Sequence, residues 1–387
     1  MYAKRSLAIA LATSAFAASA QAPVKIGFIT TLSTSSGYIG EDLRDGFRLA
    51  VKQEGGKLGG VPVELVIEDD ALKPANAKQV VDRMVQSGIR LYTGVNFSNV
   101  LAAVVPSVTK AGFTYVSANP GPSAFAGDKC EPGYFVASYQ NDWFHAAGGV
   151  AANEQGYKRV VVMAPNYQAG RDAIAGFKST YKGEVLAEIY TKLDQTDFSV
   201  ELARVRSLAP DAVYQFHPGG AGINFAKQYG SSGLGKTVPM LMPSFSMDRR
   251  MMDATGTLAG GFYVTDLWYG DLNDASRKFV KDFQATYSRV PTSYAVQAYD
   301  TANLIGSALR AVKGDVNNTG GLRAALRKAD FASLRGDFAM ANNQHPIQNM
   351  YLLQLQKDNA GGVSPKFVRK VVSKGTDAYA AACKMAS

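Results

Sequence analysis

The sequence predicts an α/β protein of two lobes, each built on a parallel sheet, and three observations lead to this prediction. Short apolar runs alternate with segments in which apolar residues recur every three to four positions, so strands alternate with helices. The same alternation starts again after Trp143. A chain of 387 residues also exceeds what a single hydrophobic core usually serves.

The first half of the chain is predicted to form one sheet with helical crossovers. Apolar runs predict strands at 24–30, 63–68, 89–93 and 113–116. A helix follows the Ser/Thr/Gly-rich loop 31–40, which contains Tyr38, and further helices are predicted at 75–87 and beyond Asn99. Ser98 or Asn99 is expected to cap the last of these helices. Strands joined by helices in this order form a parallel sheet with right-handed crossovers.

Two neighbouring strands of this sheet end in turns of small polar residues. Residues 94–99 follow the third strand, and residues 117–123 follow the fourth. Ligands bind at the carboxyl edge of open α/β sheets, and the unpaired amides of a helix N-terminus carry partial positive charge. The alternative, ordinary strand-to-helix loops without a ligand, stays open. Two such turns side by side would make a shelf suited to an anion.

The second half repeats the pattern. A strand leads from Tyr134 into a turn and a helix rich in Ala and Gly, and further strands are predicted at 159–164, 185–190, 211–216, 239–242 and 261–266. Helices are predicted at 171–181, 199–208, 224–229, 274–287, 294–312 and 322–328. Two alternating runs, 337–341 and 349–356, predict a β-hairpin. Polar loops at 165–170, 217–220 and 243–246 would then face the first lobe across a cleft.

The sequence gives no support for an enzyme. It contains no GxSxG, CxxC, HExxH or P-loop motif, and no GxGxxG follows the first strand, so no cofactor is expected. Asp69 and Asp70 end a strand without a further acidic cluster, which favours a solvated strand end over a metal site. Among the three histidines, His217 lies at a predicted cleft edge, where a hydrogen bond to a ligand and a structural role are equally open.

Residues 1–20 have the features of a cleaved secretory signal. Lys4 and Arg5 precede an Ala-rich apolar run, and Ala18-Ser19-Ala20 forms a small-x-small cleavage site. Cleavage after Ala20 makes Gln21 the first mature residue, while cleavage after Ala22 is a less favoured alternative because it would leave Pro23 first. No other stretch reaches the length of about 20 apolar residues that spans a bilayer. A soluble, exported protein is therefore expected.

The predicted export determines how the two cysteines, Cys130 and Cys383, are interpreted. In an oxidising compartment an isolated pair favours a disulfide, which would hold the C-terminal tail near the first lobe. The formal charge of +9 falls to about +7 without Lys4 and Arg5. The basic residues are scattered along the sequence, which argues against nucleic acid as a partner and mildly favours acidic small ligands.

Several segments taken together resemble the branched-chain amino acid type of periplasmic solute-binding protein. They are VKIGFITTLSTSSGYIGEDLRDGF, GVNFSNVLAAV, VSANPG, VVVMAPNYQAGRDAIAGF, DAVYQFHPGGAGINFAKQYGSSGL and SYAVQAYDTANLI, and they follow the family's order over nearly the whole mature chain. The resemblance implies a type I periplasmic binding protein. Its two Rossmann-like lobes are joined by three hinge strands, and the expected lobes are residues 21–138 with 266–336 and residues 139–265 with 337–387. It also implies a periplasmic monomer that delivers a small molecule to the membrane subunits of an ABC permease.

The resemblance places carboxylate contacts at Ser98, Asn119 and Gly121. The positions that match the ammonium contacts of amino acid binders, Ala169, Gly219-Gly220 and Phe245, carry no charge, and Asp142 is the one acid left nearby. An aromatic acid is therefore favoured, as the NYQAG and PGG loops also imply, with a branched-chain amino acid or amide, or a sensor role, as alternatives. The predicted ligand-binding residues are Tyr38, Asn96, Ser98, Asn119, Gly121, Tyr139, Asp142, Tyr167, Gln168, Ala169, His217, Gly219 and Phe245.

Overall fold

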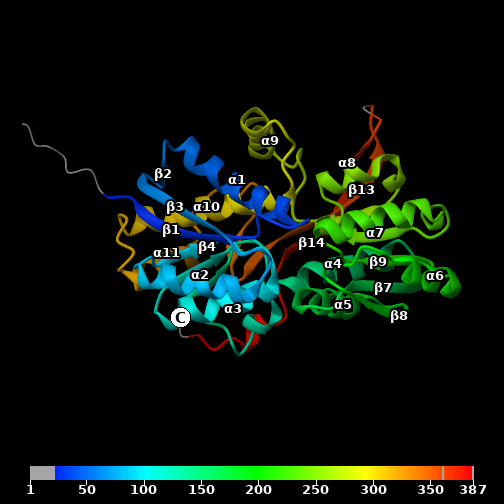
Figure 1. Cartoon of the computed structure of the whole chain (residues 1–387), viewed down its shortest axis with the longest axis horizontal. Helices are drawn as coiled ribbons and strands as arrows, with labels where there is room; N and C mark the ends of the chain where they lie inside the picture. Colours follow the sequence, from blue (N-terminus) through cyan, green and yellow to red (C-terminus); the bar gives the residue numbers. More distant parts are fainter. Residues whose placement is uncertain (1–21, 360, 386–387) are drawn as a thin grey trace, which may run out of the picture.

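The computed structural model describes residues 22–359 and 361–385, and the predicted signal segment lies outside them. In this part of the chain two sheets lie side by side along the long axis of the molecule (Figure 1). All neighbouring pairs of the first sheet are parallel except the short β2–β3 pair. Its strands are, in spatial order, β2 (Lys57–Leu58), β3 (Val61–Asp69), β1 (Val24–Thr30), β4 (Leu91–Thr93), β5 (Thr114–Ser117) and β6 (Tyr134–Val136).

The second sheet combines a parallel part with an antiparallel edge. Its parallel strands are β11 (Tyr263–Asp266), β10 (Met240–Pro243), β9 (Ala212–Gln215), β7 (Arg159–Pro165) and β8 (Glu184–Thr191). The long strand β13 (Pro346–Lys357) lies antiparallel to β11 and also pairs with β12 (Ala339–Met340) and β14 (Val363–Gly375). The predicted two-lobed α/β fold is confirmed, with this antiparallel extension added.

Helices pack against each sheet. Helices α1 and α10 contact each other on one side of the first sheet, and α2 and α3 contact each other on the opposite side (Figure 1). The helices of the first lobe are α1 (Gly37–Gln53), α2 (Pro74–Gln86), α3 (Ser98–Lys110), α9 (Asp274–Tyr287), α10 (Ser293–Ala311) and α11 (Thr319–Lys328). Those of the second lobe are α4 (Asn141–Glu154), α5 (Gln168–Thr180), α6 (Ser199–Leu208), α7 (Gly219–Ser231) and α8 (Arg249–Thr255).

Most predicted elements are present, and the differences have local reasons. Helices α6 and α9 have the predicted bounds. Helix α3 starts at Ser98, and extended Phe97 holds the N-cap position, so the prediction that Ser98 or Asn99 caps it was wrong. The elements β2 and α8 were missed because two and seven residues show too little periodicity. Strand β14 was missed because its basic residues, Lys366, Arg369, Lys370 and Lys374, interrupt the apolar alternation; basic residues are common on exposed edge strands.

Asp69 and Asp70 close the loop after β3 instead of facing solvent together. The Asp70 side chain is fully buried, and its carboxylate accepts hydrogen bonds from the Thr31 hydroxyl at 2.5 Å and the Leu72 amide at 2.8 Å. Burial raises the pKa of Asp70. The predicted solvated strand end was therefore wrong for Asp70, which ties the loop after β1 to the loop after β3.

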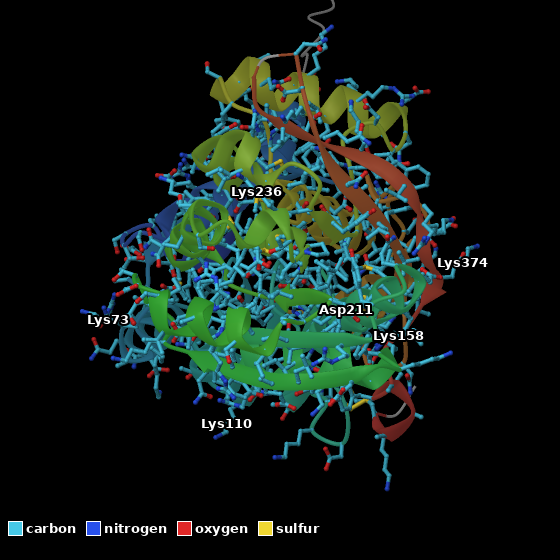
Figure 2. All side chains as sticks on the ribbon, turned by 90° about the vertical axis from the view of Figure 1, so that its right-hand side faces the viewer. Lys73, Lys110, Lys158, Asp211, Lys236 and Lys374 are labelled. Carbon is cyan, nitrogen blue, oxygen red and sulfur yellow. A yellow bond between two sulfur atoms is a disulfide. The ribbon has the colours of Figure 1, made fainter. Side chains whose placement is uncertain are left out.

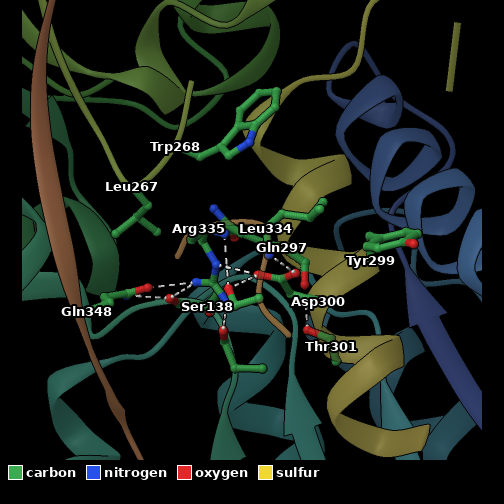
Figure 3. Close-up of polar contacts among 12 residues, drawn as sticks. Ser138, Leu267, Trp268, Gln297, Tyr299, Asp300, Thr301, Leu334, Arg335 and Gln348 are labelled. Atoms are coloured by element: carbon green, nitrogen blue, oxygen red, sulfur yellow. Dashed lines mark hydrogen bonds and ion pairs between the residues drawn. The ribbon is translucent and has the colours of Figure 1, made fainter. Parts of the chain in front are cut away.

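The chain passes between the lobes three times: after β6, after β11 and before β13. Arg335 joins the first and the third of these crossings. Its guanidinium donates to the carbonyl oxygens of Ala137 and Ser138 in the first crossing, at 2.6 and 2.8 Å, and to the Gln348 side chain on β13 at 2.8 Å (Figure 3). It also forms an ion pair of 2.8 Å with Asp300 on α10, and both side chains are fully buried. One side chain thus fixes the hinge to the first lobe.

The predicted disulfide between Cys130 and Cys383 is present. After β14 the chain leaves the second sheet, and its last described residues, drawn in red, run below α3 in Figure 1. The amide of Asn343 donates to the Asp377 carboxylate at 3.1 Å, and the Tyr379 hydroxyl donates to Asp142 at 2.6 Å. The tail is therefore a further link between the lobes, in addition to the three crossings.

Basic side chains lie apart on the molecular surface. Among the lysines labelled in Figure 2, Lys73, Lys110 and Lys374 lie at separate places on the outline, and Lys236 lies inside it. Within residues 22–359 and 361–385, no helix has the length and apolar character needed to cross a membrane. The same residues contain no cluster of three or more His, Cys, Asp or Glu side chains suited to a metal ion.

Candidate functional site

A narrow cavity lies between the lobes, where the carboxyl edges of the two sheets face each other. Its volume is about 10 Å³, close to the space of one water molecule. Ligands of open α/β folds bind at such edges. The lining residues are Ile39, Asn96, Phe97, Ser98, Asn119, Pro120, Tyr139, Tyr167, Ala169, Phe216, Pro218, Phe245 and Tyr294.

Larger hollows lie elsewhere in the described part of the chain, but they are less suited to enclosing a ligand. A groove of about 1070 Å³ on the first lobe runs between α1, α9, α10 and α11 and is open to solvent. A hollow of about 250 Å³ lies beside Asp266 and Trp268, where the chain leaves β11. Neither one faces the carboxyl edges of both sheets, so the narrow cavity is the candidate site.

Asn96 provides an unused hydrogen-bond donor in this cavity. The residue follows β4 and is 4% exposed. Its side-chain oxygen accepts from the Thr31 amide at 3.2 Å, and its backbone carbonyl accepts from the Asn119 side chain at 2.8 Å. Its Nδ2 group is buried and has no hydrogen-bond partner. Because a buried unpaired amide is costly, this group favours an acceptor atom in the cavity.

The N-terminus of α3 adds further donors beside Asn96. The N-cap residue Phe97 makes no side-chain cap, so the first backbone amides of the helix lack an intrahelical or capping partner. The Ser98 Oγ accepts a hydrogen bond from Asn141 at 3.3 Å, which leaves the Ser98 proton available to another acceptor. Asn96, Ser98 and the helix N-terminus thus form a pocket suited to an anion.

The wall contributed by the second lobe is apolar and aromatic. Phe216 stacks on Tyr167 with ring centres 6.4 Å apart, and Phe245 stacks on Tyr139 at 4.8 Å. Phe245 also lies 5.0 Å from Tyr294 of the first lobe. No residue that lines the cavity carries a charged side chain. The cavity therefore has donors at one end and aromatic rings at the other.

The structure brings part of the predicted set to the cavity. The predicted residues that line it are Asn96, Ser98, Asn119, Tyr139, Tyr167, Ala169 and Phe245. Gly121 lies behind them, donating its amide to Asn141 at 3.1 Å. A Cβ on Gly219 would lie 2.2 Å from the Ser36 Oγ of the first lobe, so this glycine allows close contact between the lobes.

Four predicted ligand contacts have other partners and do not line the cavity. Tyr38 donates to Asp248 at 2.7 Å, and Gln168 donates to Asp172 at 2.7 Å. Asp142 accepts from Tyr379 and from Gln140, and burial raises its pKa to about 6. His217 Nε2 contacts Thr191 at 3.1 Å and its Nδ1 contacts Gln215 at 2.9 Å. Burial lowers the pKa of His217 to about 3, so its imidazole is neutral.

Other residues at the cleft had no clear signal in the sequence. Phe216, Pro218 and Tyr294 line the cavity, although the sequence only places them next to polar loops or in a helix. Asp172 and Asp248 are buried at the lobe boundary, yet both occupy positions typical of an exposed helix face or helix cap. Only the packing of the two lobes identifies them.

Two α/β lobes that meet at their carboxyl edges and are joined by three crossings define a binding protein that encloses a small molecule between its lobes. Comparison with known families gives the same class. Residues 23–361 match the family model described as periplasmic binding protein, and the chain belongs to this family. Proteins of this family bind small molecules for ABC transporters, together with permease subunits, and are not enzymes.

Individual relatives support the assignment. The chain is 26% identical to Leu/Ile/Val-binding protein homolog 6 of Brucella melitensis, over 96% of this chain and 98% of that protein. A solute-binding protein of R. palustris in complex with benzoate is 31% identical, with a TM-score of 0.88 over 94% of this chain and 100% of that one. A protein of Rhodopseudomonas palustris in complex with 3,4-dihydroxybenzoic acid is 25% identical, with a TM-score of 0.86 over 92% and 99%.

Proposed function

We propose that this protein captures a small carboxylate, most specifically an aromatic acid, by closing its lobes and delivers it to an ABC permease. The observation that carries this proposal is the unpartnered Nδ2 group of Asn96, next to the uncapped N-terminus of α3 and opposite an aromatic wall. A carboxylate satisfies donors of this kind, and an aromatic ring fits the wall.

The cavity has no partner for an ammonium group. Its lining contains no acidic side chain. Asp142, the acid that the sequence left available, accepts hydrogen bonds from Tyr379 and Gln140 outside the cavity. A buried ammonium without an anionic partner costs several kcal/mol, so amino acids are disfavoured as ligands.

The structural relatives support an aromatic acid as the ligand. The two structural relatives described above were crystallised with benzoate and with 3,4-dihydroxybenzoic acid. The curated relative is named for leucine, isoleucine and valine, and it is less similar in sequence than the benzoate protein. The alternative ligand class, a branched-chain amino acid or amide, is therefore kept as a direct comparison in the experiment.

The mechanism that follows is ligand-stabilised closure. The first lobe, residues 21–138 with 266–336, would bind the carboxylate through Asn96, Ser98 and the α3 amides. The second lobe, residues 139–265 with 337–387, would then cover the ring with Phe216 and Phe245. Each charge-assisted hydrogen bond contributes roughly 1.5–3 kcal/mol, and a ligand that contacts both lobes favours the closed state.

A thermal-shift screen of the mature, ligand-free protein tests the proposal. Benzoate, cinnamate, leucine, an aliphatic diacid and an amide would each be added in large excess. A ligand at a thousand times its Kd adds about 4 kcal/mol, which raises the Tm of a chain of this size by roughly 5 °C. A rise with the aromatic acids alone is expected. A rise with leucine alone would contradict the ligand class while leaving the transport role intact.

Ser98→Ala tests the carboxylate end of the site. Loss of one charge-assisted hydrogen bond should weaken benzoate binding by about tenfold or more, measured by calorimetry. Ser199→Ala is the matched control, because Ser199 is also the first residue of a helix but lies on α6, away from the cavity. Equal affinities of Ser98→Ala and the wild type would remove Ser98 from the site.

The exported form of the protein is part of the same proposal. Cleavage after Ala20 would leave a periplasmic monomer that starts at Gln21. The intact mass of protein recovered from the periplasm measures the cleavage site directly. A mass that includes residues 1–20 would contradict the predicted signal.

A further inference from the structure

The side chain of Asn141 connects the proposed carboxylate site to the second lobe. Asn141 is the first residue of α4 and is 1% exposed. Its Nδ2 group donates to the Ser98 Oγ at 3.3 Å and to the Asp172 carboxylate at 2.9 Å. Its Oδ1 accepts from the Gly121 amide at 3.1 Å, which fixes the orientation of the side-chain amide. Asn141 thus contacts both strand-end loops of the first lobe.

Asp172 lies on α5 of the second lobe and contacts the first lobe directly. Its carboxylate accepts from the Ser123 hydroxyl at 2.7 Å and from the Ser123 amide at 3.2 Å. Gln168, one turn earlier on α5, donates to the same carboxylate at 2.7 Å. Asp172 is 4% exposed, so these hydrogen bonds replace its hydration. Because Ser123 belongs to the first lobe, the bonds from Ser123 exist only when the lobes are together.

Asn141 is not required to cap its own helix. The Gln140 side chain accepts from the Trp143 amide at 2.8 Å and so caps α4. A polar side chain that is fully buried and free of the capping role is best explained by its other partners. Those partners are the proposed ligand-binding Ser98 and the inter-lobe residue Asp172.

We infer that Asn141 and Asp172 are positioning residues that couple lobe closure to the orientation of the Ser98 hydroxyl. Within the second lobe Asp172 accepts a hydrogen bond from the Asn141 amide and so orients it. Closure brings Ser98 of the first lobe to this amide, which donates to the Ser98 oxygen. The Ser98 oxygen then acts as an acceptor towards Asn141, and its own proton is directed to the carboxylate of the ligand. This inference rests on the proposed function, because it assumes that Ser98 binds the ligand.

A double-mutant cycle with benzoate as the probe tests the coupling. Benzoate affinity would be measured by calorimetry for the wild type, Asn141→Ala, Ser98→Ala and the double variant. We expect Asn141→Ala to weaken binding by about tenfold or more in the wild type and by less than about threefold in the Ser98→Ala background. Equal losses in the two backgrounds would overturn the coupling.

Asn153→Ala is the matched control for folding. Asn153 lies at the other end of the same helix, α4, away from the cleft. Its side chain also makes two hydrogen bonds at the end of α5: it donates to the Thr180 carbonyl and accepts from the Lys182 amide, at 2.8 Å each. This variant should lower the Tm without changing benzoate affinity. An equal loss of affinity in Asn153→Ala would show that the effect of Asn141→Ala is general destabilisation.

Small-angle scattering of the ligand-free proteins separates this inference from the proposed ligand. Asn141→Ala removes the side-chain hydrogen bonds to Ser98 and Gly121 of the first lobe, so it should increase the radius of gyration relative to the wild type and Asn153→Ala. If benzoate does not bind the wild type, the proposed ligand is wrong and the scattering result alone decides the inference. An unchanged radius of gyration in Asn141→Ala would then overturn it.

Discussion

The hydroxyl of Tyr38 on α1 donates a hydrogen bond of 2.7 Å to the carboxylate of Asp248, which caps α8 in the other lobe. The Arg250 guanidinium lies 5.6 Å from the Tyr38 ring centre and 3.6 Å from Glu41 on α1. Together these contacts join the two lobes at the rim of the cleft, outside the cavity itself. Tyr38 therefore favours closure without touching the proposed ligand position.

Tyr38→Phe should weaken ligand binding without altering the cavity. The substitution removes a hydrogen bond to a carboxylate, and the closed state loses roughly 1.5–3 kcal/mol relative to the open state. We expect about a tenfold loss of benzoate affinity in calorimetry. Tyr299→Phe is the control, because the Tyr299 hydroxyl donates at 2.7 Å to Gln53 within the first lobe. Similar affinities for Tyr38→Phe and Tyr299→Phe would contradict the rim contact.

Asp248 should make stability depend on pH. Burial raises its pKa to about 7, compared with about 4 for an unfolded aspartate. Between these values the folded protein holds more protons than the unfolded chain, so this contribution to stability is present below about pH 4 and is lost as the pH rises through 7. Buried Asp142 and Asp266, each with a pKa raised to about 6, act in the same direction.

Asp248→Asn isolates the contribution of this group, since the other buried carboxylates are present in both proteins. The Tm of the variant relative to the wild type should be higher at pH 8 than at pH 5, by a few degrees. In the wild type the Met251 amide donates to the Asp248 carboxylate at 3.0 Å. Asparagine keeps a side-chain oxygen that can accept this hydrogen bond, so the helix cap is retained. The same Tm difference at both pH values would refute the prediction.

Removing Arg335 should strongly destabilise the protein. Its partner Asp300 is fully buried, and it would be left without its counter-ion at the hinge. Breaking one partner of a buried ion pair costs about 3–5 kcal/mol, which Arg335→Ala should show as a lower free energy of unfolding in urea. Arg310→Ala breaks an exposed pair with Asp330 at 3.9 Å and should cost less than about 1 kcal/mol. Comparable losses in the two variants would argue against a special role of the hinge pair.

The disulfide should contribute much of the stability of the C-terminal tail. Cys130 and Cys383 are separated by 253 positions, for which the chain-entropy model gives about 5 kcal/mol as an upper value. The double variant Cys130→Ser/Cys383→Ser and the reduced wild type should show the same loss of unfolding free energy. Thiol titration of the denatured, unreduced wild type should detect none, whereas two thiols per chain would exclude the bridge.

The sequence predicted the strand–helix order and the polar turns that follow β4 and β5. It succeeded there because apolar periodicity and small polar residues are local signals. Asn96, Ser98 and Asn119 line the cavity as expected. Tyr38 and Gln168 were expected to contact the ligand, but they do not line the cavity. The Tyr38 hydroxyl donates to Asp248, and the Gln168 side chain donates to Asp172.

The sequence by itself determined the fold class, the pairing of its two cysteines and the loops that border the cleft, because each of these follows from composition and spacing along the chain. Only the tertiary structure decided which polar groups remain unpaired. The sequence left Asp142 available for an ammonium group, but in the structure Asp142 accepts a hydrogen bond from Tyr379 of the C-terminal tail. Both ring nitrogens of His217 likewise have partners, Thr191 and Gln215. Hydrogen bonds between residues far apart in the chain depend on how the lobes pack, and this information is absent from local patterns.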